Sequence, residues 1–200
     1  MTYRSATFAT VLAASLLAPG LGARAQSPEA GKPMIDQFAD TFAAACEPMI
    51  VSRMGDSARE QLGTEVSPRL IDEMESVGRT GVCGCFVQRM RDSSGTPLAA
   101  PFETGDIDAY LEGLRPDFDR CMGDALKPKI ATLCTLTADT VGKPASETCA
   151  CVGREVQAID SAEFARSTDH MFRAFNRDTP ATETSNALER IIARCSAARQ

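Results

Sequence analysis

The chain has 200 residues, of which 21 are basic, 27 are acidic and one is histidine, so its formal net charge is −6. An acidic chain repels the phosphate backbone of nucleic acids and anionic lipid surfaces, and nucleic-acid binding is therefore not expected. Aromatic residues make up 6% and tryptophan is absent, which indicates a core poor in large rings. The cysteines number eight, an even set that is typical of disulfide frameworks in oxidising compartments.

The N-terminus has the pattern of a secretory signal peptide. Arg4 supplies a positive charge, an apolar run extends from Ala6 to Ala18, and Ala23-Arg24-Ala25 has the form of a cleavage site. The run is too short to span a bilayer and no later stretch is suitable, so we expect no membrane insertion. Residues 1–25 are therefore expected to be removed, which predicts export to the periplasm or the medium of a bacterium. The mature chain has 19 basic and 27 acidic residues, a net charge of −8.

Residues 26–32 are expected to form a flexible tail, and the first helix is predicted to begin at Pro33. Apolar residues then recur at spacings of three and four, as on one face of a helix. Pro48 is expected to kink or end this helix near Cys46. A second helix is predicted to open at Ser67-Pro68, a cap followed by a first-turn proline, and to end at Gly78.

A third helix is predicted from about Val82, with Phe86 and Met90 on its apolar face. The stretch 93–105 contains two prolines and two glycines and is predicted to be a loop. Asp106 is expected to cap the next helix, with a break at Pro116. Lys127-Pro128-Lys129 marks the join between two halves of the chain.

The second half repeats this order. Helices are predicted from Ile130 to Val141 and through the stripe that ends at Ile159, with a turn at 142–146 between them. Asp160 is expected to cap a further helix that continues through Met171 and Phe175. After a loop at 176–182, the last helix is predicted to carry Leu188, Ile191, Ile192 and Cys195.

All eight cysteines follow one pattern, which occurs twice. In each set a Cys-x-Cys pair has one lone cysteine before it and one after it. The predicted disulfide cysteines are Cys46, Cys83, Cys85 and Cys121 in the first set, and Cys134, Cys149, Cys151 and Cys195 in the second. No segment alternates with period two, so strands are not expected. The sequence therefore predicts an all-α protein of two degenerate helical repeats of about three helices each, residues 33–127 and 128–200, stapled by disulfides and packed as one helical domain.

The spacing within each pair predicts how the bonds run. Positions i and i+2 of an α-helix point about 200° apart, at roughly 100° per residue, so the two cysteines can reach different helices but cannot easily bond each other. In both pairs the first cysteine is expected to face the apolar side and the second the flank. We expect bonds within each set, one to the preceding helix and one to the following helix. Spacing leaves open which of the two remaining pairings each set adopts.

Redox and metal interpretations of the cysteines fit less well. Thiol–disulfide enzymes use Cys-x-x-Cys beside a strand, and zinc sites use pairs two to four residues apart. Copper handling is the better metal hypothesis, because exported copper proteins use thioether and imidazole ligands. Most of the seven mature methionines fall on apolar helical stripes, where methionine fills the core. These methionines are Met34, Met49, Met54, Met74, Met90, Met122 and Met171.

The titratable residues form no defensible catalytic set. His170 is the only histidine, and its helical neighbours are charged, so it is expected to face solvent. The carboxylates of Asp160, Glu163 and Asp169 could support acid–base chemistry, but a solvated polar face is the commoner use of such a cluster. The glycines fit neither a dinucleotide nor a phosphate loop. No catalytic residue, cofactor or metal ligand is therefore assigned.

These observations favour an exported, disulfide-stabilised helical protein that binds another protein without catalysis, as an inhibitor, an immunity protein or a chaperone does. The acidity makes a basic partner compatible. The alternative hypothesis is periplasmic handling of copper or another metal, or an enzyme whose site is assembled from residues far apart in the sequence. Metal content after purification discriminates between the two.

Overall fold

The computed structural model describes residues 33–63, 65–143, 146–168, 171, 175 and 186–197. Most of these residues are helical and none of them lies in a strand, which confirms the all-α prediction. None of the helices in this part of the chain is long and apolar enough to cross a membrane. The predicted signal peptide, the tail of residues 26–32 and the loop at 176–182 lie outside the described residues.

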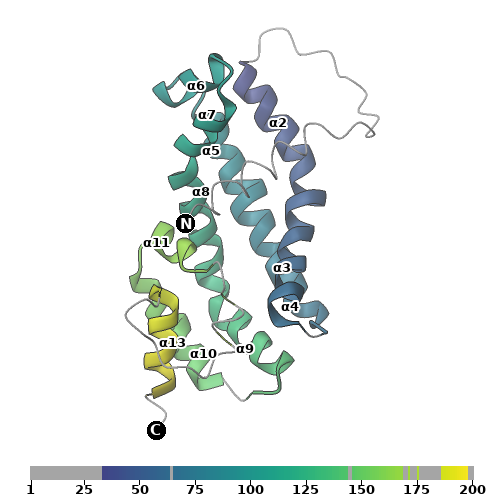
Figure 1. Ribbon diagram of the computed structural model, residues 1–200, viewed down its shortest axis with the longest axis vertical. Coiled ribbons are helices and arrows are strands. Elements are labelled where there is room, and N and C mark those ends of the chain that lie inside the picture. The colour runs from purple at the N-terminus through teal and green to yellow at the C-terminus, as the bar shows by residue number, and fades with distance from the viewer. Residues whose placement is uncertain are drawn as a thin grey trace. The chain divides into compact units, whose positions relative to one another are not determined.

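The chain forms two compact units, whose helices are labelled in Figure 1. Unit 1 consists of the described residues of Met1–Ala45 together with Val87–Arg115, and unit 2 consists of those of Cys46–Phe86 and Pro116–Gln200. These bounds differ from those of the predicted halves, residues 33–127 and 128–200. The duplication, and the packing of the halves as one domain, stay predictions.

Unit 1 is built from short helices around a small core. Pro33 precedes its first helix, and the Pro33 carbonyl accepts bonds from the N–H groups of Asp36 and Gln37 at 3.0 and 3.3 Å. The Asp106 carboxylate accepts a bond from Ala109 N–H at 3.0 Å, which confirms the predicted cap. The helices are α2 (Met34–Cys46), α5 (Val87–Asp92), the 3-10 turn η3 (Pro97–Ala99), α6 (Ala100–Glu103) and α7 (Ile107–Gly113).

The prediction of a loop at residues 93–105 is wrong, because η3 and α6 lie within it. Pro97 and Pro101 each occupy the first turn of a short helix, where a proline loses no hydrogen bond. Gly95 and Gly105 flank the two turns with φ angles of 73° and 85°. Proline and glycine therefore mark the ends of these turns and do not exclude helix.

Unit 2 holds the remaining elements, two of which are π-helical. The elements are η1 (Glu47–Val51, π-helical), α3 (Ser52–Leu62), α4 (Pro68–Gly78), η2 (Arg79–Phe86, π-helical), α8 (Arg115–Leu126), the 3-10 turn η4 (Lys127–Lys129), α9 (Ile130–Thr140), α10 (Ser146–Glu155), the 3-10 turn η5 (Val156–Ala158), α11 (Ser161–Arg166) and α13 (Ala187–Ala197). Within this unit α3 packs on α4, α9 on α4 and α10, and α10 on α13.

Side-chain caps begin several helices of unit 2. Ser67 Oγ accepts a bond from Leu70 N–H at 3.3 Å and thereby caps α4, as predicted. A reciprocal pair begins α13, because Asn186 Oδ1 accepts from Glu189 N–H at 2.9 Å and the Glu189 carboxylate accepts from Asn186 N–H at 3.0 Å. These bonds satisfy N–H groups that have no partner within the helix.

The α-helix α4 ends at Gly78, as predicted, but the chain continues directly as the π-helical η2. The residue is buried, and a Cβ atom there would lie 2.7 Å from Met54 Sδ. Glycine at this position allows α3 and α4 to approach each other, which is a packing role. The stretch between Pro48 and Ser67 also holds a helix, α3, for which the sequence analysis assigned no element.

The helix that begins after Asp160 is shorter than predicted. It ends at Arg166, where the Ser167 hydroxyl donates to the Glu163 carbonyl at 3.0 Å. Met171 and Phe175 are again helical, so the prediction of one continuous helix is wrong, whereas the helical conformation of these two residues is confirmed. Ser167 is buried, and its hydroxyl provides a hydrogen bond to a backbone carbonyl in the last turn of the helix.

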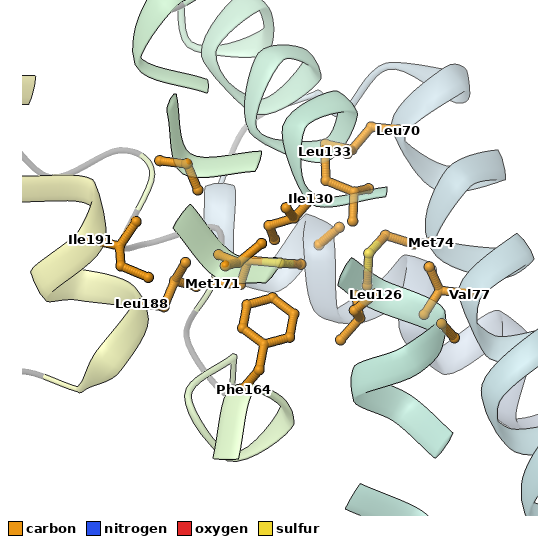
Figure 2. Close-up of a cluster of buried hydrophobic side chains, with 14 of the residues drawn as sticks. Leu70, Met74, Val77, Leu126, Ile130, Leu133, Phe164, Met171, Leu188 and Ile191 are labelled. Atoms are coloured by element: carbon orange, nitrogen blue, oxygen red, sulfur yellow. The ribbon is translucent and has the colours of Figure 1, made fainter. Parts of the chain in front are cut away.

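The core of unit 2 is aliphatic. Figure 2 shows side chains from α4, α8, α9, α11 and α13 converging, with Phe164 and Met171 among leucines and isoleucines. Leu70, Ile130 and Leu133 are fully buried there. Burying a side chain of this size contributes roughly 1.5–3 kcal/mol. Apolar burial and covalent bridges together hold this unit.

Candidate functional site

Four disulfides connect the helices of unit 2, and every cysteine of the chain takes part. The Cα atoms of the bonded residues lie 5.5–5.7 Å apart. The bonds are Cys46–Cys83, Cys85–Cys121, Cys134–Cys149 and Cys151–Cys195. All four stay within the predicted sets. In both sets the first cysteine of the pair bonds backward and the second forward, which decides between the two pairings that spacing left open.

The two Cys-x-Cys pairs differ in their local backbone. Cys149 is buried and Cys151 is half-buried in the α-helix α10, as the predicted apolar and flanking positions require. Cys83 and Cys85 are both half-buried, so the predicted difference between them is wrong for the first pair. They lie in π-helical η2, where more residues fit in each turn and the α-helical assignment of faces no longer applies.

The π-helical segments η1 and η2 lie beside each other in unit 2. The Cys46–Cys83 bond joins the residue that precedes η1 to the middle of η2, and Arg79 of η2 donates to the Glu47 carboxylate of η1 at 2.7 Å. This hydrogen bond and the adjacent negative charge raise the pKa of the Arg79 guanidinium. On another side of η2, a Cβ atom at Gly81 would lie 3.2 Å from the Cys121 carbonyl oxygen. The first Cys-x-Cys pair is therefore held by bonds, charge and close packing, which is a structural role.

The described residues hold no cluster of histidine, cysteine and acidic side chains suited to a metal ion. Since both thiols of every pair are bonded, no thiolate is available as a nucleophile or a ligand. Among the methionines, Met74, Met90 and Met171 are buried as core residues, whereas Met34 is exposed. The structure therefore adds no ligand set to the copper hypothesis.

The structure gives Asp160 a capping role. Its carboxylate accepts bonds from the N–H groups of Glu163 and Ala162, at 3.1 and 2.9 Å. The bond from Glu163, followed by that from Ala162, holds the pKa of Asp160 below its usual 3.8 against the opposing effect of partial desolvation. Asp169 and His170 lie outside the described residues, so the proposed grouping of three carboxylates and the exposure of His170 stay predictions.

A shallow hollow of about 320 Å³ lies over α9. Small and hydroxylated side chains of α9 form most of its lining, with the two charged residues Arg69 and Asp139. Sites for small molecules enclose most of the ligand surface. This hollow is open to solvent, and we assign it no ligand.

The large exposed apolar side chains of the described residues lie in unit 1. Within the described residues, three large hydrophobic side chains are exposed, and all belong to unit 1: Met34, Leu98 and Ile107, at 61%, 42% and 38% of their full accessible surface. An aromatic group lies beneath them, in which the Phe102 ring is 5.2 Å from Phe38 and 5.1 Å from Tyr110 between centroids. This surface was not predicted from the sequence, because Met34 on α2 is far in the sequence from Leu98 and Ile107.

Tyr110 anchors this aromatic group. The Ser93 hydroxyl donates to the Met90 carbonyl at 2.7 Å and is hydrogen-bonded to the Tyr110 hydroxyl at 2.9 Å, and the Tyr110 hydroxyl also donates to the Met90 carbonyl at 3.4 Å. Burial raises the pKa of Tyr110 above its usual 10.0, while the bond with Ser93 acts in the opposite direction. A second link within unit 1 is the ion pair between Arg91 and Asp40, at 2.9 Å. These bonds hold α2, α5 and α7 in register around the rings.

Comparisons of the chain with protein-family models, with curated proteins and with solved structures found no match.

Proposed function

We propose that this protein is exported and serves as a non-catalytic module that binds another, basic protein. The predicted signal peptide of residues 1–25 supports export. The four disulfides indicate an oxidising environment, such as the periplasm or the medium of a bacterium. The stapled helical frame suits an inhibitor, an immunity protein or a chaperone of the envelope.

The observation that carries the proposal is where the negative charge lies. The mature chain has an excess of eight acidic residues over basic ones. In the described part of the chain, Asp119 is the one acidic residue that is buried, and it pairs with Arg166 at 3.3 Å. The excess is therefore displayed on the surface, where it attracts positively charged partners and accelerates their association.

Affinity capture tests this proposal. Mature protein with intact disulfides is immobilised and exposed to its own envelope fraction at low and high ionic strength. We expect a basic partner whose association rate falls as salt rises from about 0.02 M to about 0.5 M, because exposed charges are then screened. His170→Ala should leave this binding intact.

Two results contradict the proposal. One is a stoichiometric metal ion in protein purified from its native compartment, which would favour metal handling. The other is loss of the protein's activity in His170→Ala while circular dichroism shows an unchanged fold, which would place a catalytic or metal site around residues 163–173.

A further inference from the structure

We infer that the partner binds one end of unit 1, and that the segment it presents is a basic amphipathic helix. The binding surface, here called the acidic–apolar end, consists of Met34, Leu98, Ile107, Glu103, Asp106, Asp108 and Glu112. The inference rests on the proposed function and adds to it a place and a partner class.

The apolar part of this surface is one neighbourhood. Met34 lies one helical turn before Phe38 on α2, and Ile107 lies one turn before Tyr110 on α7. Phe102 contacts both of those rings. On the last turn of α7, a Cβ atom at Gly113 would lie 3.4 Å from Leu98 Cδ2, so η3 also packs on α7. The three exposed side chains therefore surround a single aromatic group.

The segment that carries Leu98 and Ile107 has charged side chains of one sign. Residues 93–114 contain no lysine, arginine or histidine. The four carboxylates on α6, on α7 and at the Asp106 cap are exposed, and within the described residues none of them forms an ion pair. An apolar centre with an acidic rim fits a helix with apolar residues on one face and basic residues at its edges.

Charge complementarity also decides against a second copy of this chain. Two copies meeting at the acidic–apolar end would place like carboxylates opposite each other, which is unfavourable. A basic helix instead brings lysine or arginine to the same carboxylates. The hydroxyl bond of Tyr110 and the Arg91–Asp40 ion pair hold the underlying helices before binding, so less ordering is required when the partner arrives.

The test uses the full mature protein and a designed peptide of leucine and lysine, about 14 residues long, with an amphipathic helical pattern. Binding is measured by fluorescence anisotropy at low salt. We expect Leu98→Ser with Ile107→Ser to weaken binding about tenfold or more, because apolar centres carry most of the affinity of an interface. Leu98→Met with Ile107→Leu keeps the apolar character and should bind as wild type does.

A charge comparison separates this surface from general acidity. Glu103→Gln with Glu112→Gln should lower the association rate, whereas Glu60→Gln with Asp72→Asn, which removes two exposed carboxylates from α3 and α4 of unit 2, should have a smaller effect. A peptide of leucine and glutamate with the same pattern should not bind. Circular dichroism checks that each variant keeps its helices.

The inference is overturned if the leucine–lysine peptide does not bind, if the serine variants bind it as wild type does, or if the unit 2 charge variant weakens it equally. In the last two cases the protein still binds a basic partner, so the proposed function stands and only the place is wrong. If the capture experiment finds no partner whose binding depends on salt, by contrast, the proposed function itself is wrong.

Discussion

Units 1 and 2 are both helical, but they are held by different means. Unit 2 contains all eight cysteines, a largely aliphatic main core that includes Phe164, and an edge-on contact between the rings of Phe86 and Phe118 at 5.2 Å between centroids. Unit 1 contains no disulfide among its described residues and relies on the rings of Phe38, Phe102 and Tyr110, one ion pair and a hydroxyl bond. The covalently fixed unit therefore serves as frame, and the exposed apolar side chains belong to the unit held by weaker interactions.

The largest effect is expected from removing the bridges of unit 2. In the chain-entropy description, opening the 44-residue loop of Cys151–Cys195 lowers the free energy of unfolding by about 4 kcal/mol and opening the 15-residue loop of Cys134–Cys149 by about 3 kcal/mol. Alanine replaces both cysteines in each variant, and denaturant unfolding gives the difference. An equal or reversed order would show that native packing around the bonds outweighs loop length.

The next largest loss of stability is expected when a side chain is added where unit 2 has no room for it. A Cβ atom at Gly123 would lie 1.9 Å from the Ser161 carbonyl oxygen, and backbone cannot move aside as a side chain does. Gly123→Ala should therefore lower the free energy of unfolding by about 3 kcal/mol or more. In unit 1, Gly113→Ala meets only an ordinary contact with Leu98 and is the matched control. Thermal unfolding should show it to be neutral or slightly stabilised, since alanine favours helix.

A smaller effect is expected from Tyr110→Phe in unit 1. This variant should lower the free energy of unfolding by about 1 kcal/mol, because a buried hydroxyl bond is lost while Ser93 keeps its bond to the Met90 carbonyl. The variant should also alter the response to alkali. Since the folded-state pKa of Tyr110 is raised above 10.0, its contribution is complete below that pH and is lost as pH rises through the folded value. Urea unfolding across this range should show a steeper decline for wild type than for Tyr110→Phe, and identical slopes would contradict the assignment.

The smallest effect concerns the cap of α11. The folded-state pKa of Asp160 is lowered, so its carboxylate contributes stability that is present above pH 3.8 and is lost as pH falls through the folded value. Asp160→Asn keeps an acceptor but does not titrate. The stability difference between the two proteins should therefore shrink in acid. A difference that stays constant down to about pH 2 would mean that charge is not what the cap supplies.

Local signals predicted much of the fold from the sequence. Three predicted helix caps are confirmed, at Ser67, Asp106 and Asp160. A short polar side chain just before an apolar stripe is typical of a cap, because its oxygen accepts a bond from an N–H group of the first turn. Cysteine order predicted that bonds stay within each set. Pro48 was expected to kink or end the first helix; α2 ends at Cys46, and the chain continues as a π-helix that accommodates the proline.

The acidic–apolar end could not be predicted in the same way. Met34 is far from Leu98 and Ile107 in the sequence, and each of the three looks like an ordinary apolar position of a helix or loop. Their exposure follows from which face the aromatic group occupies, and that depends on tertiary packing. Gly78 shows a related limit: α4 ends at this glycine as predicted, but its close packing could not be predicted, since a Cβ atom there would lie 2.7 Å from Met54 Sδ.

The order of the four bonds also determines what one cut by a protease can do. Each bond closes a ring, and the rings run from Cys46 to Cys83, from Cys85 to Cys121, from Cys134 to Cys149 and from Cys151 to Cys195. A single break of the backbone inside any ring leaves both fragments covalently joined. Between Cys46 and Cys195, only a break beside Gly84 or Ala150, or between Cys121 and Cys134, separates the molecule. A protein cross-linked in this way persists as one molecule after most single cleavages.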